Sequence, residues 1–86
     1  MDEAAQTQAL IEHILKEVIR RPIELTPDSK LVSSGLIDSF ALVDILLKVE
    51  DVTGLRIPAS KVGPKDMDTV RLMLATAKRV GKPPKA

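Results

Sequence analysis

The chain has 86 residues, which is enough for one domain and too few for two. It contains no cysteine, which excludes disulfides, thiolate metal sites and a cysteine nucleophile together. Apolar residues make up 44% of the chain and are almost all aliphatic, so the composition favours a small helical bundle over a β-sandwich. No apolar stretch approaches the roughly 20 residues of a membrane span, and no secretory signal is visible. We expect a cytoplasmic monomer without membrane insertion, with a single domain over residues 1–81 and a flexible tail over residues 82–86.

The formal net charge of +1 hides a segregated distribution of charge. Residues 38–51 contain four acids and a single base, Lys48, whereas residues 52–86 contain eight basic and two acidic side chains. A basic segment can attract nucleic acid, but this one has no aromatic side chain for base stacking and no zinc-ligand spacing. We therefore expect no nucleic-acid partner.

The first segment, residues 3–20, has the spacing of an amphipathic helix. Pro22 disfavours helical geometry at Arg21, so this helix should end near there. From Pro22 to Ile37 the chain shows no sustained period and is rich in turn-forming residues, which predicts a long loop. We expect four apolar side chains to hold the loop to the bundle: Ile23, Leu25, Leu31 and Leu36.

A second helix is predicted from Asp38, as its N-cap, to Thr53. Gly54 follows at the position where a helix end favours a left-handed residue. The apolar residues of this helix are too widely spread for one narrow stripe. The helix is therefore either buried on two sides or presents an apolar strip to a partner.

A last helix should begin near Asp68 or Thr69 and stop at Gly81, shortly before two prolines. Between the second and last helices, residues 59–62 fit one short helical turn. The chain as a whole predicts an all-α bundle of three main helices plus one short helix, with a long loop between the first two.

The most informative string is Gly35-Leu36-Ile37-Asp38-Ser39-Phe40, at the junction of the long loop and the second helix. It places the Ser39 hydroxyl in the first helical turn, where free N–H groups and the helix dipole favour a phosphate attached to that serine. A simpler interpretation is that Asp38 and Ser39 only cap the helix, because both residue types are common at helix starts.

Asp-Ser followed by an apolar residue, after Gly-Leu-Ile and before Val43-Asp44, resembles the attachment motif of acyl carrier proteins. The resemblance extends over nearly the whole chain, through Ile57-Pro58 to the final helix. In that family the serine carries a covalent 4′-phosphopantetheine, installed from coenzyme A by a separate phosphopantetheinyl transferase, and the thiol of this arm holds the cargo as a thioester. The resemblance implies that Ser39 is the attachment site and Asp38 its preceding acid.

The same resemblance implies a docking face for partner enzymes on the second helix. Its acidic positions would be Asp44, Glu50 and Asp51, and its apolar positions Phe40, Val43 and Leu47. Such carriers are not enzymes: an activating ligase loads them and downstream transferases act on the cargo. The near-neutral net charge, and Lys48 within the helix, set this chain apart from the strongly acidic fatty-acid carriers.

Two features resemble carriers of activated amino acids, such as the D-alanyl carrier group. One is Asp-Ser-Phe in place of the commoner Asp-Ser-Leu, and the other is the long stretch between Pro58 and the last helix. We expect an aminoacyl cargo, with a short acyl group of the polyketide type as the second choice. A short polar cargo needs no apolar cavity, so the aliphatic core could stay closed around it.

Two alternatives stay open from the residues alone. One is a non-catalytic helical interaction module without a prosthetic group, in which Ser39 is only a cap, and the other is a basic nucleic-acid binder. Catalysis by the chain itself is disfavoured, because a serine hydrolase needs a base and an oxyanion site. The lone histidine, His13, is expected at the surface or boundary of the first helix. One histidine and no cysteine also argue against a metal site.

Overall fold

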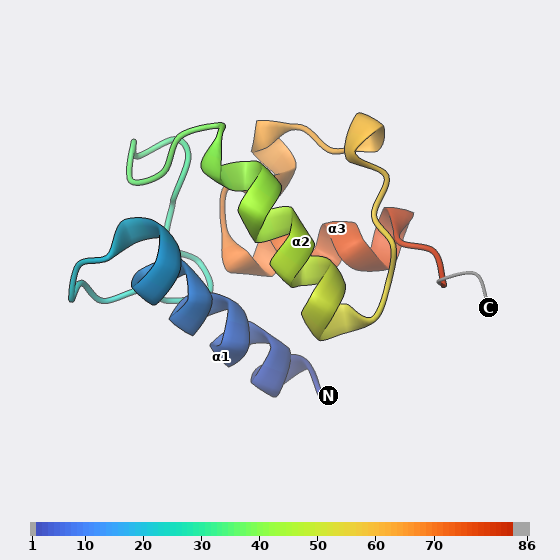
Figure 1. Cartoon of the computed structure of the whole chain (residues 1–86), viewed down its shortest axis with the longest axis horizontal. Helices are drawn as coiled ribbons and strands as arrows, with labels where there is room; N and C mark the ends of the chain where they lie inside the picture. The colour runs from blue at the N-terminus through green and yellow to red at the C-terminus, as the bar shows by residue number, and fades with distance from the viewer. Residues whose placement is uncertain (1, 84–86) are drawn as a thin grey trace.

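The computed structural model describes residues 2–83, which form helices joined by turns and one long loop (Figure 1). Within these residues there are three α-helices, α1 (Glu3–His13), α2 (Ala41–Thr53) and α3 (Val70–Val80). Shorter segments accompany them: the π-helix η1 (Ile14–Ile19) and the 3-10 turns η2 (Ala59–Lys61) and η3 (Pro64–Met67). The predicted all-α bundle is confirmed, although two 3-10 turns replace the one short helix expected. No helix of the described residues is long and apolar enough to cross a membrane.

The first helix changes its winding before it ends. Its start is capped by Asp2, whose carboxylate accepts a hydrogen bond from the N–H of Ala5 at 2.7 Å. At the far end, the N–H of Arg20 donates to the carbonyl oxygen of Leu15, five residues earlier, at 2.8 Å. Arg20 then adopts a left-handed conformation, with a φ of 57°, which ends the helix where the sequence predicted.

The helices enclose a core of aliphatic side chains. Helices α1 and α2 pack against each other, and α3 crosses behind α2 (Figure 1). The buried apolar residues are Leu10, Ile11, Ile14, Leu25, Leu31, Ile37, Ile45, Val49, Val52, Ile57, Met67, Val70, Met73, Leu74 and Ala77. Their removal from water is the main favourable contribution to folding in so short a chain.

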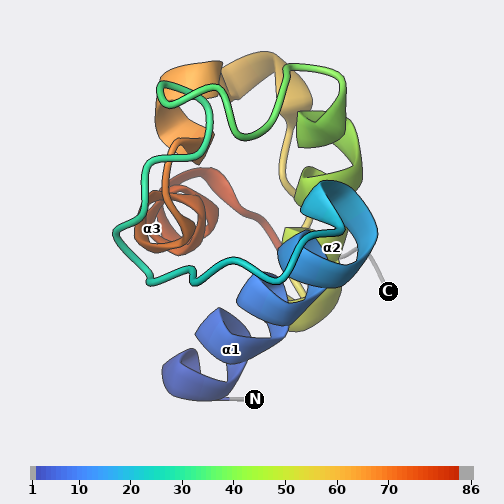
Figure 2. The same ribbon diagram turned by 90° about the vertical axis from the view of Figure 1, so that its left-hand side faces the viewer.

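The long loop between η1 and α2 runs past the start of α3 (Figure 2). The four apolar contacts predicted for it are confirmed: Leu25 and Leu31 are buried, and Ile23 and Leu36 pack against the core. The loop therefore contributes to the core as well as connecting two helices.

A single carboxylate also holds the middle of this loop. Atom Oδ1 of Asp68, just before α3, accepts hydrogen bonds from the N–H groups of Leu31 (3.2 Å), Val32 (2.8 Å) and Ser33 (2.9 Å). The carbonyl oxygen of Asp68 accepts a further bond from the Leu31 N–H at 2.8 Å. This polar contact fixes the loop shortly before it enters α2.

Two contacts of the loop lower the pKa of a carboxyl group. Hydrogen bonds from Ser33, and then from the two residues before it, hold the pKa of Asp68 below its ordinary value of 3.8. The Arg71 guanidinium donates to the carboxylate of Asp28 at 2.6 and 3.0 Å and lowers the pKa of that group in the same way. Both carboxyl groups therefore stabilise the fold while they are ionised.

Replacing Asp68 by alanine should destabilise the protein, because the N–H groups of Val32 and Ser33 lose their acceptor, the first of them in a partly buried place. The Leu31 N–H keeps its bond to the backbone carbonyl of residue 68. The midpoint of urea unfolding should fall. Asp51→Ala is the matched control, since it removes an exposed carboxylate and should leave the midpoint close to that of the wild type. Equal midpoints for the two variants would contradict the role of Asp68.

The same contact sets the sign of a pH dependence. Because the folded pKa of Asp68 lies below 3.8, its contribution to stability is fully present above that value and is lost as the pH falls through the folded pKa. Below about pH 4 the wild type should therefore lose stability more steeply than Asp68→Ala, as measured by urea unfolding over a pH series. Asp28 acts in both proteins, so the difference isolates Asp68. Parallel pH curves would show that the contact does not form.

Two glycines end helices for different reasons. Gly54 follows α2 with a φ of 72°, the left-handed conformation predicted for it. Gly81 follows α3 in an extended conformation, with a φ of −67°, so it does not use the left-handed region. A Cβ atom at Gly81 would instead clash with the carbonyl oxygen of Ala77, so close approach of the backbone explains this glycine.

The chain stays paired just beyond α3. Lys82 exchanges two backbone hydrogen bonds with Arg56, at 2.8 and 2.9 Å. The tail predicted over residues 82–86 thus begins with a paired residue, and residues 84–86 lie outside the described part of the chain.

Candidate functional site

Ser39 lies where the long loop meets α2. The carboxylate of Asp38 accepts a hydrogen bond from the N–H of Ala41 at 3.0 Å, which is the contact of a capping residue. Ser39 and Phe40 form a turn before the regular helix, which begins at Ala41 rather than directly after Asp38. The side chain of Ser39 is exposed, and within residues 2–83 its hydroxyl makes no hydrogen bond. Asp38 therefore does the capping, and the Ser39 hydroxyl stays accessible for chemistry.

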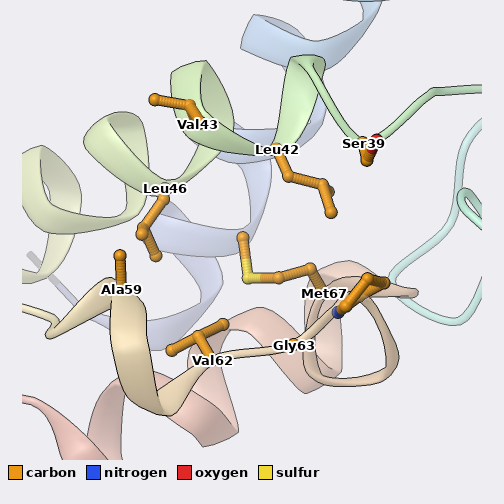
Figure 3. Close-up of a pocket in the computed structure, with 9 residues that line it drawn as sticks. Ser39, Leu42, Val43, Leu46, Ala59, Val62, Gly63 and Met67 are labelled. Carbon is orange, nitrogen blue, oxygen red and sulfur yellow. The ribbon is translucent and has the colours of Figure 1, made fainter.

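An apolar cleft opens beside Ser39, between α2 and the segment that carries η2 and η3 (Figure 3). Its volume is about 260 Å³. The lining residues are Ser39, Leu42, Val43, Leu46, Ala59, Val62, Gly63, Pro64 and Met67. Met67, which is buried, extends toward α2 across the cleft. An apolar surface is thus available next to Ser39, while the core behind α2 is closed.

A strip of apolar side chains runs along the outer face of α2 from Ser39. Phe40 is 88% exposed, Val43 66% and Leu47 60%. Their spacing of three and four residues places them on one side of the helix. Among the described residues, Leu72 on α3 is the other large apolar side chain that is exposed. We call Phe40, Val43 and Leu47 the apolar strip. Exposed apolar side chains gathered in this way make the strip a candidate contact surface.

The three acids predicted for the docking face already have partners within the chain. Asp44 contacts Nε2 of His13 at 2.8 Å, which joins α2 to the end of α1. Asp51 pairs with Lys48 at 3.3 Å on the same helix. Glu50 lies at the end of the apolar strip, partly buried. These contacts leave Asp44 and Asp51 exposed and turn Glu50 inward.

The carboxylate of Glu50 has a structural contact that the sequence did not reveal. It accepts a hydrogen bond from the N–H of Ile57 at 2.8 Å and so ties the connection after α2 back to the helix. Ile57 itself is buried. Glu50 therefore fixes the start of the connection between α2 and η2, in addition to any contribution that it makes to docking.

Glu50→Ala should destabilise the protein by about 1 kcal/mol, because the Ile57 N–H loses its acceptor in a partly buried place. Glu50→Gln keeps an acceptor oxygen, so this variant should lose less stability than Glu50→Ala. Urea unfolding of both variants, beside Asp51→Ala, measures the difference. If all three match the wild type, the contact adds nothing to stability.

Comparison with known proteins agrees with this geometry. Residues 9–76 match the family described as "Phosphopantetheine attachment site", and the chain belongs to that family. It is therefore a carrier protein whose prosthetic group, 4′-phosphopantetheine, is attached covalently. The chain is also similar to a D-alanyl carrier protein from Abiotrophia defectiva, with 29% identity over 75 residues, which cover 86% of this chain and 90% of that protein. A search of solved structures gave no significant match.

The site fits the prosthetic group of the family. The serine that follows Asp38 is exposed, its hydroxyl is unengaged, and the cleft beside it leaves room for an attached arm. Within residues 2–83 no group of three or more histidine, cysteine, aspartate or glutamate side chains could hold a metal ion. His13, predicted at a surface or boundary position, is partly buried against Asp44 and lies on α1 rather than beside Ser39.

Proposed function

We propose that Ser39 is the attachment site of the phosphopantetheine arm. The observation that carries this proposal is the exposed hydroxyl of Ser39 directly after the capping residue Asp38, inside the segment that matches the family. Asp38 would position the turn by its bond to the Ala41 N–H, which leaves the neighbouring hydroxyl facing solvent. In the transfer reaction the Ser39 oxygen forms a bond to the β-phosphorus of coenzyme A, 3′,5′-ADP leaves, and a base on the transferase takes the hydroxyl proton.

The prosthetic group would supply the thiol that the chain lacks, since the sequence contains no cysteine. The role of the protein is then to hold and present the arm. We propose that partner enzymes, first the phosphopantetheinyl transferase and then a loading ligase, contact the face formed by α2. This face comprises Phe40, Val43, Asp44, Leu47, Glu50 and Asp51, with the exposed apolar strip as its centre.

Ser39→Ala should abolish modification while leaving the fold intact. Incubation with coenzyme A and a broad-specificity phosphopantetheinyl transferase should add one phosphopantetheinyl group to the wild type, as read by intact mass. Ser60→Ala removes another exposed serine, in η2, and should be modified like the wild type. The circular dichroism of Ser39→Ala should be nearly unchanged, because its side chain is exposed and unbonded. Modification that persists in this variant would place the site elsewhere.

We propose that the cargo is an amino acid, activated by an adenylating ligase and held as a thioester on the arm. The similarity to a D-alanyl carrier protein supports this class of cargo. The Asp38-Ser39-Phe40 string and the long connection between α2 and α3 are consistent with it. We expect the carrier to act as a monomer.

A short acyl group is the second candidate, and the apolar cleft beside Ser39 favours it. The cleft, of about 260 Å³, is lined by Leu42, Leu46 and Val62 among others. Each methylene group that enters such a place would stabilise the loaded protein by about 0.8 kcal/mol. An amino acid with a charged amino group gains little from the same surface.

Loading tests separate the two cargo classes. The modified protein would be offered adenylating ligases together with a panel of amino acids, and separately acyl donors, with the thioester read by mass. We expect aminoacyl loading, and melting temperatures that are similar for two-carbon and eight-carbon thioesters. Absence of aminoacyl loading, together with marked stabilisation by the longer chain, would contradict the aminoacyl proposal and indicate a fatty-acyl carrier instead.

A further inference from the structure

Met67 forms the floor of the cleft beside Ser39. Among the residues that line this cleft, Met67 is the one that is buried, with 2% of its surface exposed, whereas the others are partly or largely exposed. Its side chain extends from η3 toward α2, in the direction of Leu42 and Leu46 (Figure 3). A group that enters the cleft from the Ser39 side therefore meets this side chain at the bottom.

The packed core lies behind the floor. The segment η3 packs against α3, and Met67 belongs to the same cluster of buried side chains as Val70 and Met73 of that helix. Protein cores of this kind are filled about as densely as organic crystals, so they offer no free space for a further group. The cleft therefore ends at Met67, and its depth is determined by that side chain.

The residues on both sides of Met67 are anchored. The carbonyl oxygen of Asp66 accepts a hydrogen bond from the hydroxyl of Thr76, a buried residue of α3, at 3.2 Å. On the other side, the carbonyl oxygen of Asp68 accepts from the N–H of Leu31 in the long loop at 2.8 Å. The methionine side chain can adapt its shape, but its backbone cannot withdraw from the cleft without breaking these bonds.

We propose that Met67 determines the size of the cargo that the carrier can shelter. A group on the arm is stabilised when its apolar carbon atoms enter the cleft. Beyond the first few carbon atoms the Met67 side chain occupies the space, so further methylene groups stay in contact with water. The cleft therefore suits a short acyl group or an amino acid and gives little to a long chain. This inference rests on the proposed attachment of the arm to Ser39 and adds a residue that determines specificity.

The test compares two cargo lengths on the wild type and on Met67→Ala. A broad-specificity phosphopantetheinyl transferase would attach the arm from acetyl- or octanoyl-coenzyme A, with each product confirmed by intact mass. Melting temperatures would be measured by circular dichroism. In the wild type the octanoyl and acetyl forms should melt within about 2 °C of each other. In Met67→Ala the octanoyl form should melt about 5 °C or more above the acetyl form, because the chain fills the space that the methionine leaves.

Met73→Ala is the matched control. It removes another buried methionine, but Met73 lies on α3 and does not line the cleft. Both variants should melt below the wild type, since each leaves a cavity in the core. In Met73→Ala the two cargo forms should nevertheless melt together, because the floor of the cleft is still in place. Met67→Val keeps more of the packing and should show the behaviour of Met67→Ala with a smaller difference, so it decides the question if the alanine variant does not fold.

Three results would overturn the role of Met67. One is a wild type that the octanoyl chain already stabilises as much as it stabilises Met67→Ala. Another is the absence of extra stabilisation in both Met67 variants. The third is an equal gain in Met73→Ala, which would show that any cavity in the core is sufficient.

The masses separate this inference from the proposed function. A wild type that accepts the arm but gives one of these three results refutes only the role of Met67. A wild type that accepts no arm refutes the attachment at Ser39, and the inference that rests on it falls with it.

Discussion

The carboxylate of Asp68 ties the loop to the start of α3, and the geometry around Ser39 depends on that contact. Three consecutive N–H groups, of residues 31–33, converge on one oxygen atom. Leu31 and Ile37 are buried on either side of this turn, so polar and apolar contacts fix the same short stretch. The chain then reaches Asp38 from a defined direction, and the capping bond to Ala41 completes the approach to α2. Without these contacts the loop would not place Ser39 in a defined position at the start of α2.

The exposed apolar strip lies beside Ser39 and contributes little to folding. A thin aliphatic core gives a small protein little stability to spare, and a side chain as exposed as Phe40 adds little to the stability of the fold. Its exposure next to Ser39 is consistent with the docking face that we propose, on which a partner protein would cover it. The core behind α2 is closed by Ile45, Val49 and Val52, so the strip is not needed for folding.

The acids of the proposed docking face differ in their contacts: some stabilise the fold and others stay exposed at the surface. Glu50 is held by the Ile57 N–H, whereas Asp44 contacts His13 and stays exposed. An exposed contact of this kind contributes little to stability, and the charge of the Asp44 carboxylate remains available to steer a partner. A formal net charge of +1 is therefore compatible with strong local contrast, since residues 38–51 are acidic on balance and residues 52–86 are basic.

Sequence alone determined the helices, because apolar spacing, the capping residue Asp38 and Gly54 act through local geometry. It also predicted Ser39 as the attachment site, since motif and position lie within a few adjacent residues. What only the tertiary structure decided were contacts between distant residues: Asp68 with residues 31–33, and Glu50 with Ile57. The cleft belongs to this second group, because its walls come from α2 and from residues 59–67, whose approach depends on packing. The spacing of apolar residues in the sequence shows which side of a helix is apolar. The side chains that pack against that side are determined by how the helices cross in the folded protein.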